Sequence, residues 1–246
     1  MSILATEIWE NRFFNGQWTV AEKNYAVTEV ATGDPLGVMG YAQPSDVQHS
    51  AQQAKIAQEK WWALSYQERA QIFENAIQVA IDHKADIIEW LIKESGSIVM
   101  KASFETDLAI QSLKNAMILP SSVQGSVLPT QNGKFSLAKR LPLGVVGVIS
   151  PFNFPLYLAI RAIAPALALG NAVVLKPDER TAVSSGFVIA RIFELAGLPK
   201  GLLHVLPGGA EVGEALVNDS NIASIQFTGS TEVGRIIGAG AGRTLK

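Results

Sequence analysis

The sequence predicts an α/β protein built on a doubly wound parallel β-sheet, and the prediction rests on the pattern after residue 141. Four short apolar segments alternate there with four helical patterns, an order typical of parallel sheets with helical crossovers. Successive positions in these segments are apolar, which indicates strands buried on both faces. The predicted strands are 145–150, 172–176, 202–206 and 223–228, and the predicted helices are 155–169, 184–196, 211–218 and one from 230 onward.

The first part of the chain is expected to contain hairpins. The segment FFNGQWTV places Asn15-Gly16 between aromatic flanks, a signal for a two-residue type I′ turn. This turn predicts a hairpin within 13–30. The segment ATGDPLG supplies a second turn at Gly33-Asp34-Pro35.

Helices follow these hairpins. Ser45 is the expected N-cap of the first helix, and Ser65 with Glu68 fits a capping box at the start of the next helical region. Gly96 is the expected C-cap of that region, and Pro120 ends a third helix. The predicted helical regions span 45–64, 65–95 and 101–119.

Residues 123–140 fit neither pattern. They are polar, contain Gly125, Pro129 and Asn132-Gly133, and end in FSLAKR, a short alternating strand. A strand that leaves the main pattern suits pairing with another subunit, and a plain surface hairpin explains it equally well. The chain is therefore divided into an N-terminal part over 1–122, a β arm over 123–140 and an α/β segment over 141–246.

Composition narrows the function. The chain has 246 residues, a net charge of −2 and no run of Lys or Arg, so a nucleic-acid partner is not expected. It has no apolar stretch of about 18 residues and no pattern of a signal peptide, which predicts a cytoplasmic protein without a membrane partner. Cysteine is absent, and the three histidines have no metal-ligand spacing. No metal site is expected.

The ends of the four predicted strands carry the candidate binding and catalytic residues. These ends read SPFNFP, KPDE, LPGGAE and FTGST. The carboxyl ends of parallel strands meet at one edge of a sheet, where ligands bind. The four segments are therefore expected to lie together.

Two of the segments suit parts of a nucleotide. Gly229 permits a tight turn and Ser230 is a good N-cap residue, and the free N–H groups of a helix N-terminus bind phosphate. Lys176 and Glu179 are placed to hydrogen-bond a ribose diol, and a carboxylate there favours free hydroxyls over a 2′-phosphate. For the Gly229-Ser230 segment, the simpler explanation is a well-capped turn. For Lys176 and Glu179, it is an exposed ion pair.

The other two segments suit close approach and catalysis. Gly208 and Gly209 let a ligand approach the backbone. Asn153 stands on a connector stiffened by Pro151 and Pro155, and a fixed amide donor can stabilise an oxyanion by roughly 3 kcal/mol. For the two glycines, the simpler alternative is a flexible turn. For Asn153, it is a turn whose geometry needs Pro and Asn. Together the four segments predict a dinucleotide site beside a reaction centre.

The sequence resembles the aldehyde dehydrogenase superfamily. The matching segments are FFNGQW, ATGDPLG, PLGVVGVISPFNFP, APALALGNAVVLKPDE, AGLPKGLLHVLPG and FTGSTEVGR. Phe152 stands where many members carry Trp, as in the benzaldehyde and vanillin dehydrogenase-like branch. The resemblance implies a Rossmann-like sheet without GxGxxG, an aldehyde substrate, NAD as cofactor and assembly of copies through the 123–140 arm. NADP remains an alternative, since loop movement accommodates both cofactors.

The resemblance also assigns roles to residues. Asn153 matches the oxyanion-stabilising asparagine, Lys176 and Glu179 match the pair that holds the adenosine ribose, and Ser230 matches the pyrophosphate contact. Gly209 matches a glycine on the adenine side. The cofactor contacts implied in this way are Ile149, Ser150, Pro151, Phe152, Lys176, Glu179, Gly209, Phe227, Thr228, Gly229, Ser230 and Val233.

The family mechanism needs two groups that this sequence lacks. A cysteine attacks the aldehyde, hydride passes to NAD, and a glutamate activates the water that hydrolyses the thioester. The chain has no cysteine, and the Glu-Leu-Gly-Gly segment that carries the base is expected just after Lys246. This chain is therefore predicted to hold the cofactor-binding half without the catalytic domain, and to be inactive alone.

Two alternatives stay open. The chain is either part of a dehydrogenase or a catalytically inactive nucleotide-binding or assembly module. Within the enzymes, relatives that reduce acyl phosphates or form acyl-CoA share parts of the same pattern. The sequence does not distinguish these chemistries, because the fate of the thioester depends on the water-activating residue.

Overall fold

A six-stranded sheet forms the centre of the molecule in the computed structural model, which describes residues 2–246. Its strand order is β10-β7-β8-β9-β1-β2. The first four strands run parallel, and β1 and β2 join the far edge as an antiparallel hairpin. The strands are β7 (Val145–Ile149), β8 (Ala172–Lys176), β9 (Leu203–Val205), β10 (Ile222–Phe227), β1 (Arg12–Phe14) and β2 (Trp18–Val20).

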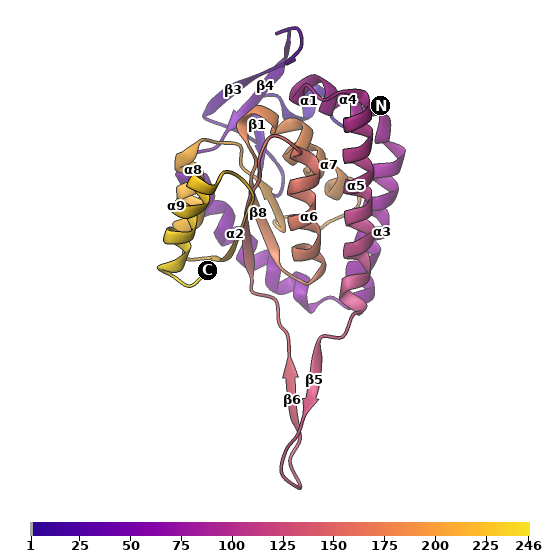
Figure 1. Ribbon diagram of the computed structural model, residues 1–246, viewed down its shortest axis with the longest axis vertical. Helices are drawn as coiled ribbons and strands as arrows, with labels where there is room; N and C mark the ends of the chain where they lie inside the picture. Colours follow the sequence, from indigo (N-terminus) through magenta and orange to yellow (C-terminus); the bar gives the residue numbers. More distant parts are fainter. Residues whose placement is uncertain (1) are drawn as a thin grey trace.

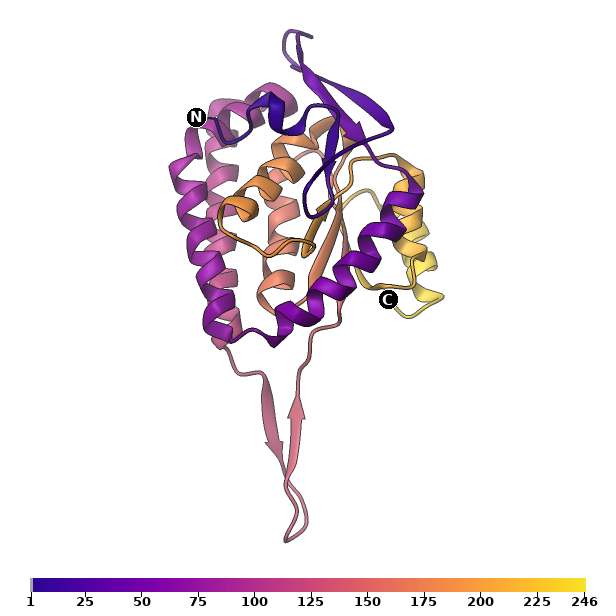
Figure 2. The ribbon, with the colours of Figure 1, turned by 180° about the vertical axis from the view of Figure 1, so that it is seen from behind.

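Helices cover both faces of this sheet (Figures 1 and 2), so the predicted doubly wound α/β fold is confirmed. One face is covered by α6 and α7, and α3, α4 and α5 pack outside them. The other face is covered by α2, α8 and α9; in Figure 2, α2 runs diagonally across it. The helices are α2 (Pro44–Ala63), α3 (Tyr66–Asp82), α4 (Lys84–Ser95), α5 (Val99–Ile118), α6 (Pro155–Ala168), α7 (Val188–Leu195), α8 (Ala210–Asn218) and α9 (Thr231–Gly242).

Smaller elements complete the chain. A short helix, α1 (Thr6–Trp9), precedes β1, and the hairpin β3 (Lys23–Thr28) to β4 (Pro35–Tyr41) lies above the sheet in Figure 1. The predicted turn within 33–35 joins these two strands. No helix among the described residues has both the length and the apolarity needed to cross a membrane.

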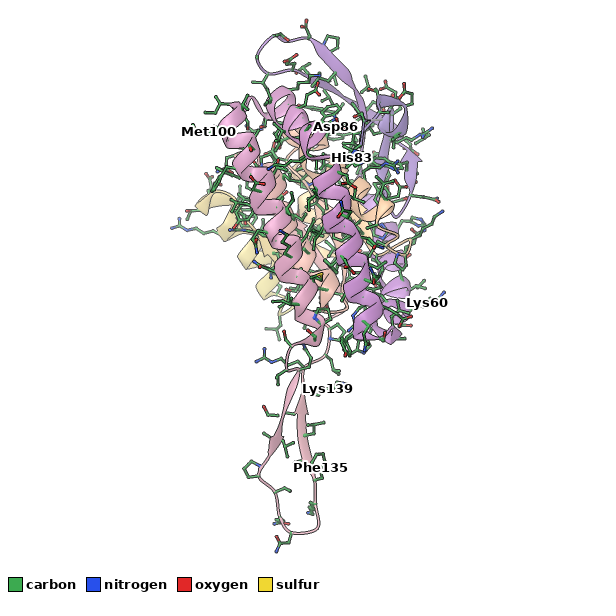
Figure 3. The ribbon with its side chains drawn as sticks, turned by 90° about the vertical axis from the view of Figure 1, so that its right-hand side faces the viewer. Lys60, His83, Asp86, Met100, Phe135 and Lys139 are labelled. Atoms are coloured by element: carbon green, nitrogen blue, oxygen red, sulfur yellow. The ribbon has the colours of Figure 1, made fainter. Side chains whose placement is uncertain are left out.

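The 123–140 arm is a hairpin of β5 (Gly125–Leu128) and β6 (Ser136–Lys139). It extends from the body of the molecule, and Phe135 stands well along it (Figure 3). Val127, Phe135 and Leu137 are exposed by 66%, 75% and 57%. The predicted strand is therefore confirmed, and the arm carries apolar side chains that the rest of the chain does not cover.

Three local predictions are wrong. Phe14 pairs with Trp18, so the turn has three residues instead of two, because Asn15 N–H donates to the Gln17 carbonyl. The first helix begins with Gln43 as N-cap, not Ser45, because Asp46 accepts from the Gln43 N–H. The edge strand β10 is not buried throughout, since it has a neighbour on one side only.

Two helical predictions are also corrected. The region over 65–95 is two helices separated at His83, whose φ is −104° and ψ is 16°. The helix predicted from residue 184 begins with a π-helical turn over Val183–Phe187, and regular α-helix starts at Val188. The capping box at Ser65 and Glu68 and the left-handed Gly96 C-cap are confirmed.

A buried carboxylate lies at the start of that π-helical turn. Glu94 is 2% exposed and accepts hydrogen bonds from the N–H groups of Val183 and Ser184. Burial raises the pKa of Glu94 to about 7, against the lowering effect of these hydrogen bonds. The carboxylate links α4 to the beginning of α7 and satisfies two N–H groups of a helix N-terminus.

This arrangement predicts a pH-dependent stability. The folded pKa of Glu94 lies above the ordinary value of 4.5, so the folded state binds more protons than the unfolded state between these values. The free energy of unfolding should therefore fall as pH rises from 4.5 to 7, by on the order of 3 kcal/mol from this group. Glu94→Gln should remove that slope in urea denaturation series. Glu89→Gln, an exposed change on the same helix, should preserve it; equal slopes in both variants would contradict the assignment.

Candidate cofactor site

A cavity of about 670 Å³ opens at the carboxyl ends of β7, β8 and β10. The chain passes from β7 to β8 on one side and later returns to β10 on the other side of β7. Such a switch point leaves a crevice between the diverging connections, where open α/β sheets bind ligands. The topology therefore places the cavity where the strand ends carry their polar residues.

The cavity brings together all the residues predicted to bind the cofactor. They come from the loop after β7, the loop after β8, the start of α8 and the turn between β10 and α9. The cavity is lined by Ile149, Ser150, Pro151, Phe152, Lys176, Glu179, Gly209, Phe227, Thr228, Gly229, Ser230 and Val233. Three lining residues were not predicted: Asp178, Arg180 and Ala210. Asp178 and Arg180 flank Glu179 in the segment KPDER. The charged residues of that segment are the sequence signal from which both could have been predicted.

Two polar groups in the cavity wall lack partners. The Ser150 hydroxyl is buried with no hydrogen bond, and no hydrogen bond or ion pair within residues 2–246 involves the Lys176 ammonium. Burial lowers the pKa of Lys176, against the opposing effect of nearby carboxylates such as Asp178 and Glu179. Buried polar groups usually find partners, so these two suit a polar ligand such as a nucleotide.

Glu179 is held by a residue from the other end of the chain. The Tyr41 hydroxyl donates to Glu179 Oε2 at 2.7 Å, across 138 positions of sequence. Tyr41 was missed by sequence reasoning, because it lies in a hairpin strand with no motif around it. The contact ties the β3–β4 hairpin to the edge of the cavity.

Gly209 lies close to the ends of two side chains. Its φ is −79°, which any residue adopts. A Cβ at this position would lie 2.5 Å from Glu211 Oε2 and 2.9 Å from the Tyr41 hydroxyl oxygen. Gly209 is the N-cap of α8, and the close approach of a ligand to its backbone stays a prediction.

The turn before α9 has the predicted cap. The Ser230 hydroxyl accepts a hydrogen bond from Val233 N–H at 3.3 Å, and α9 begins at Thr231. Gly229 lies against the Phe227 ring, where a Cβ would approach within 2.5 Å. Gly229, Ser230 and Val233 line the cavity, so the start of α9 is a candidate anion-binding position.

The Arg180 guanidinium contacts two neighbouring side chains. Its Nε and one terminal nitrogen donate to the two Asp178 carboxylate oxygens at 2.8 and 2.9 Å, and its guanidinium lies 3.9 Å from the centroid of the Phe152 ring. Burial opposes ionisation of Asp178, but the hydrogen bonds from Arg180 outweigh it and lower the pKa of Asp178. The ion pair and the cation–π contact together fix one wall of the cavity.

Asn153 stands beside the cavity rather than in its wall. It is exposed, and its Oδ1 accepts from the Phe154 N–H at 3.1 Å. This contact turns the amide oxygen to the backbone and leaves Nδ2 free to donate. The amide is therefore oriented by its own chain neighbour, in addition to the prolines predicted to fix it.

A clamp from α5 holds the loop that carries Asn153. Glu105 is fully buried and its Oε1 accepts from the N–H groups of Leu156 and Tyr157 at 2.9 and 3.2 Å. Lys101 Nζ donates to Glu105 Oε2 at 2.9 Å and lies 4.4 Å from the centroid of the Phe154 ring. The loop is thus fixed where α6 begins.

A second cavity of about 350 Å³ adjoins the first and lies between α8 and α9. Both cavities share Lys176 and Gly209. The walls that belong to the second one alone include Val217, Ile236 and Ile237. An apolar slot that continues from a polar cavity suits a ligand with a flat ring at one end.

These features define an α/β protein with a candidate ligand site at a topological switch point. The model of the aldehyde dehydrogenase family matches residues 18–246, and the chain belongs to that family. The family is therefore the one that the sequence motifs predicted.

Individual relatives sharpen the comparison. A vanillin dehydrogenase from an Amycolatopsis strain is 54% identical and covers 100% of this chain and 51% of its own length. A benzaldehyde dehydrogenase [NAD(+)] from Pseudomonas putida is 46% identical over 97% of this chain and 50% of its own length. The chain thus spans about half the length of these relatives.

A solved structure shows the same fold. The crystal structure of an NAD-dependent benzaldehyde dehydrogenase from Corynebacterium glutamicum matches with a TM-score of 0.89 and 40% identity. The match covers 94% of this chain and 51% of that one. The predicted resemblance to the benzaldehyde and vanillin dehydrogenases is confirmed.

The α5 clamp generates a prediction for the loop. Glu105→Gln removes the charge that pairs with the partly exposed Lys101 and should lower the free energy of unfolding by about 1.5 kcal/mol, because hydrogen bonds to a charged acceptor would be replaced by weaker ones. Amide exchange of Leu156 and Tyr157 should accelerate. Urea denaturation and hydrogen exchange measure both effects. Glu232→Gln, an exposed acidic residue in the first turn of α9, is the control; a similar small change in both variants would show that the clamp contributes nothing.

Proposed function

We propose that this chain is the cofactor-holding part of an NAD-dependent aldehyde dehydrogenase that oxidises an aromatic aldehyde to its carboxylic acid. The observation that carries the proposal is the cavity at the switch point, which gathers every residue predicted for the cofactor. The similarity to a vanillin dehydrogenase and a benzaldehyde dehydrogenase supports the aromatic substrate.

Each part of the cavity has a function in this proposal. The Lys176 ammonium and the Glu179 carboxylate hold the two hydroxyls of the adenosine ribose. The α9 N-terminus at Ser230 binds the pyrophosphate through its N–H groups, and the apolar slot between α8 and α9 receives the adenine. The loop that contains Phe152 lies against the nicotinamide side.

The chemistry proposed for the chain's own residues is electrostatic. NAD, when bound, accepts hydride from the aldehyde carbon. Asn153 directs its free Nδ2 at the aldehyde oxygen and donates to it as negative charge develops. The clamp of Glu105 and Lys101 keeps this donor in place. The thiol that attacks the aldehyde belongs, in this proposal, to residues outside this sequence.

The test separates cofactor binding from chemistry. Glu179→Gln and Lys176→Ala should each weaken NAD binding to this chain by about ten-fold, because each loses a hydrogen bond to the ribose. Isothermal titration calorimetry measures the affinities. Asn153→Ala should leave NAD affinity unchanged, and in the complete gene product it should lower kcat by about 100-fold or more.

The outcome that contradicts the proposal is equally clear. A folded chain that binds neither NAD nor NADP at millimolar concentration would remove the cofactor assignment. NAD binding without aldehyde oxidation by the complete gene product would favour the inactive nucleotide-binding module instead.

We also propose that the 123–140 arm joins copies of the protein. Its exposed Val127, Phe135 and Leu137 support this role, since apolar side chains on a hairpin suit pairing with another subunit. The double change Phe135→Asp and Leu137→Lys should shift sedimentation towards the monomer. An unchanged sedimentation coefficient would identify the arm as a plain surface hairpin. Gln131→Lys, a polar change at the arm tip, is the control.

A further inference from the structure

The Tyr41 side chain is fixed on two sides. Its ring stacks on the Tyr25 ring, with centroids 5.8 Å apart and planes inclined by 17°. Its hydroxyl donates to Glu179 Oε2 at 2.7 Å. The paired strands β3 and β4 supply both tyrosines, with Tyr25 opposite Met39 and Lys23 opposite Tyr41. A rigid hairpin therefore carries the hydroxyl to the edge of the cavity.

The hydrogen bond from Tyr41 leaves the two carboxylate oxygens of Glu179 in different environments. Oε2 is occupied by Tyr41, and within residues 2–246 no hydrogen bond involves Oε1. A carboxylate with one oxygen held cannot rotate freely about its last torsion. Because Glu179 lines the cavity, the remaining oxygen is available to a ligand there.

The hydroxyl acts as a donor under all ordinary conditions. Burial, followed by the hydrogen bond and charge of Glu179, raises the pKa of Tyr41 above its usual range. The proton consequently stays on the tyrosine. Glu211 is a second carboxylate near this hydroxyl, as shown by the position of Gly209, where an added Cβ would contact both groups. The hydroxyl nevertheless donates its hydrogen bond to Glu179.

Two cations lie near Glu179 in the cavity lining, Lys176 and Arg180, and the guanidinium of Arg180 is already paired. Recognition of a 2′-phosphate at this position usually needs an arginine. Arg180 is adjacent in sequence, but both its hydrogen bonds go to Asp178 and its plane lies over Phe152. A 2′-phosphate would therefore meet a fixed carboxylate, with the Lys176 ammonium but no free guanidinium to offset the repulsion.

We propose that Tyr41 is a positioning residue that sets the cofactor preference, by locking Glu179 in the orientation that accepts a ribose hydroxyl and repels a 2′-phosphate. The inference rests on the proposed function, because it assumes that Glu179 meets the adenosine ribose. It goes beyond that proposal in assigning NAD selectivity to a hairpin that lies outside the cavity wall. A carboxylate freed from Tyr41 can turn away from a phosphate, which lowers discrimination.

The test compares two matched tyrosine changes. Tyr41→Phe removes the hydroxyl and keeps the stacked ring, whereas Tyr25→Phe makes the same change on a tyrosine whose hydroxyl does not contact Glu179 within the described residues. Titration calorimetry of the chain with NAD and with NADP gives the ratio of the two affinities. Tyr41→Phe should lower the preference for NAD by roughly ten-fold, and Tyr25→Phe should change it less than two-fold.

A double-mutant cycle separates positioning from general destabilisation. Glu179→Gln alone should remove most of the preference, and adding Tyr41→Phe to it should change the ratio no further, because Tyr41 acts only through Glu179. Far-UV circular dichroism checks folding. If Tyr41→Phe does not fold, Glu179→Asp tests the same contact from the other side, since the shorter side chain cannot reach the hydroxyl; it should lower the preference in the same way.

The outcomes distinguish the two proposals. A wild-type chain that binds neither cofactor refutes the proposed function itself. A wild-type chain that prefers NAD, with an unchanged ratio in a folded Tyr41→Phe or Glu179→Asp variant, refutes the role of Tyr41. An equal fall in Tyr25→Phe would also refute it, because it would trace the effect to the hairpin's packing.

Discussion

Helix α6 is held at both ends by side chains from the first 122 residues, and the candidate site depends on this. At its start, Glu105 accepts from two backbone N–H groups. At its end, carbonyls accept from other helices: Trp61 Nε1 donates to Leu167 O at 2.8 Å, and Gln58 Nε2 donates to Gly170 O at 2.7 Å. The Glu105 contacts satisfy N–H groups of the first turn, which the helix cannot pair itself. They also fix α6 along its axis, and with it the loop from β7.

The site then follows from what this fixed loop faces. The strand ends place an ammonium and a carboxylate on one side of the cavity and a helix N-terminus on another. Asp178 and Arg180, which also line the cavity, are paired with each other. Lys176 and Oε1 of Glu179 keep hydrogen-bonding capacity for a ligand. The N-terminal helices thus contribute rigidity, and the β3–β4 hairpin reaches the edge of the site through Tyr41.

The sequence predicted this organisation where each element carried a local signal. Apolar segments that alternate with helical patterns predicted the parallel strands. Motifs at the ends of these strands predicted the residues that line the cavity, except Asp178, Arg180 and Ala210. The Ser65 capping box and Gly96 are local signals of the same kind. Tyr41, Glu94 and Glu105 left no such signal, because their partners lie 138, about 90 and about 51 positions away. The π-helical turn escaped prediction for the same reason, since a distant carboxylate meets its first N–H groups.

The most direct test of the central claim is amide hydrogen exchange of this chain with and without NAD. The account predicts slower exchange on NAD addition in the segments 150–154, 177–180 and 228–233, where the strand ends meet. Exchange in the arm over 123–140 should stay unchanged, because the arm extends from the body of the molecule (Figure 1) and supplies no lining residue of the cavity among the described residues. Protection confined to other segments, or no protection at saturating NAD, would contradict a cofactor site at the switch point.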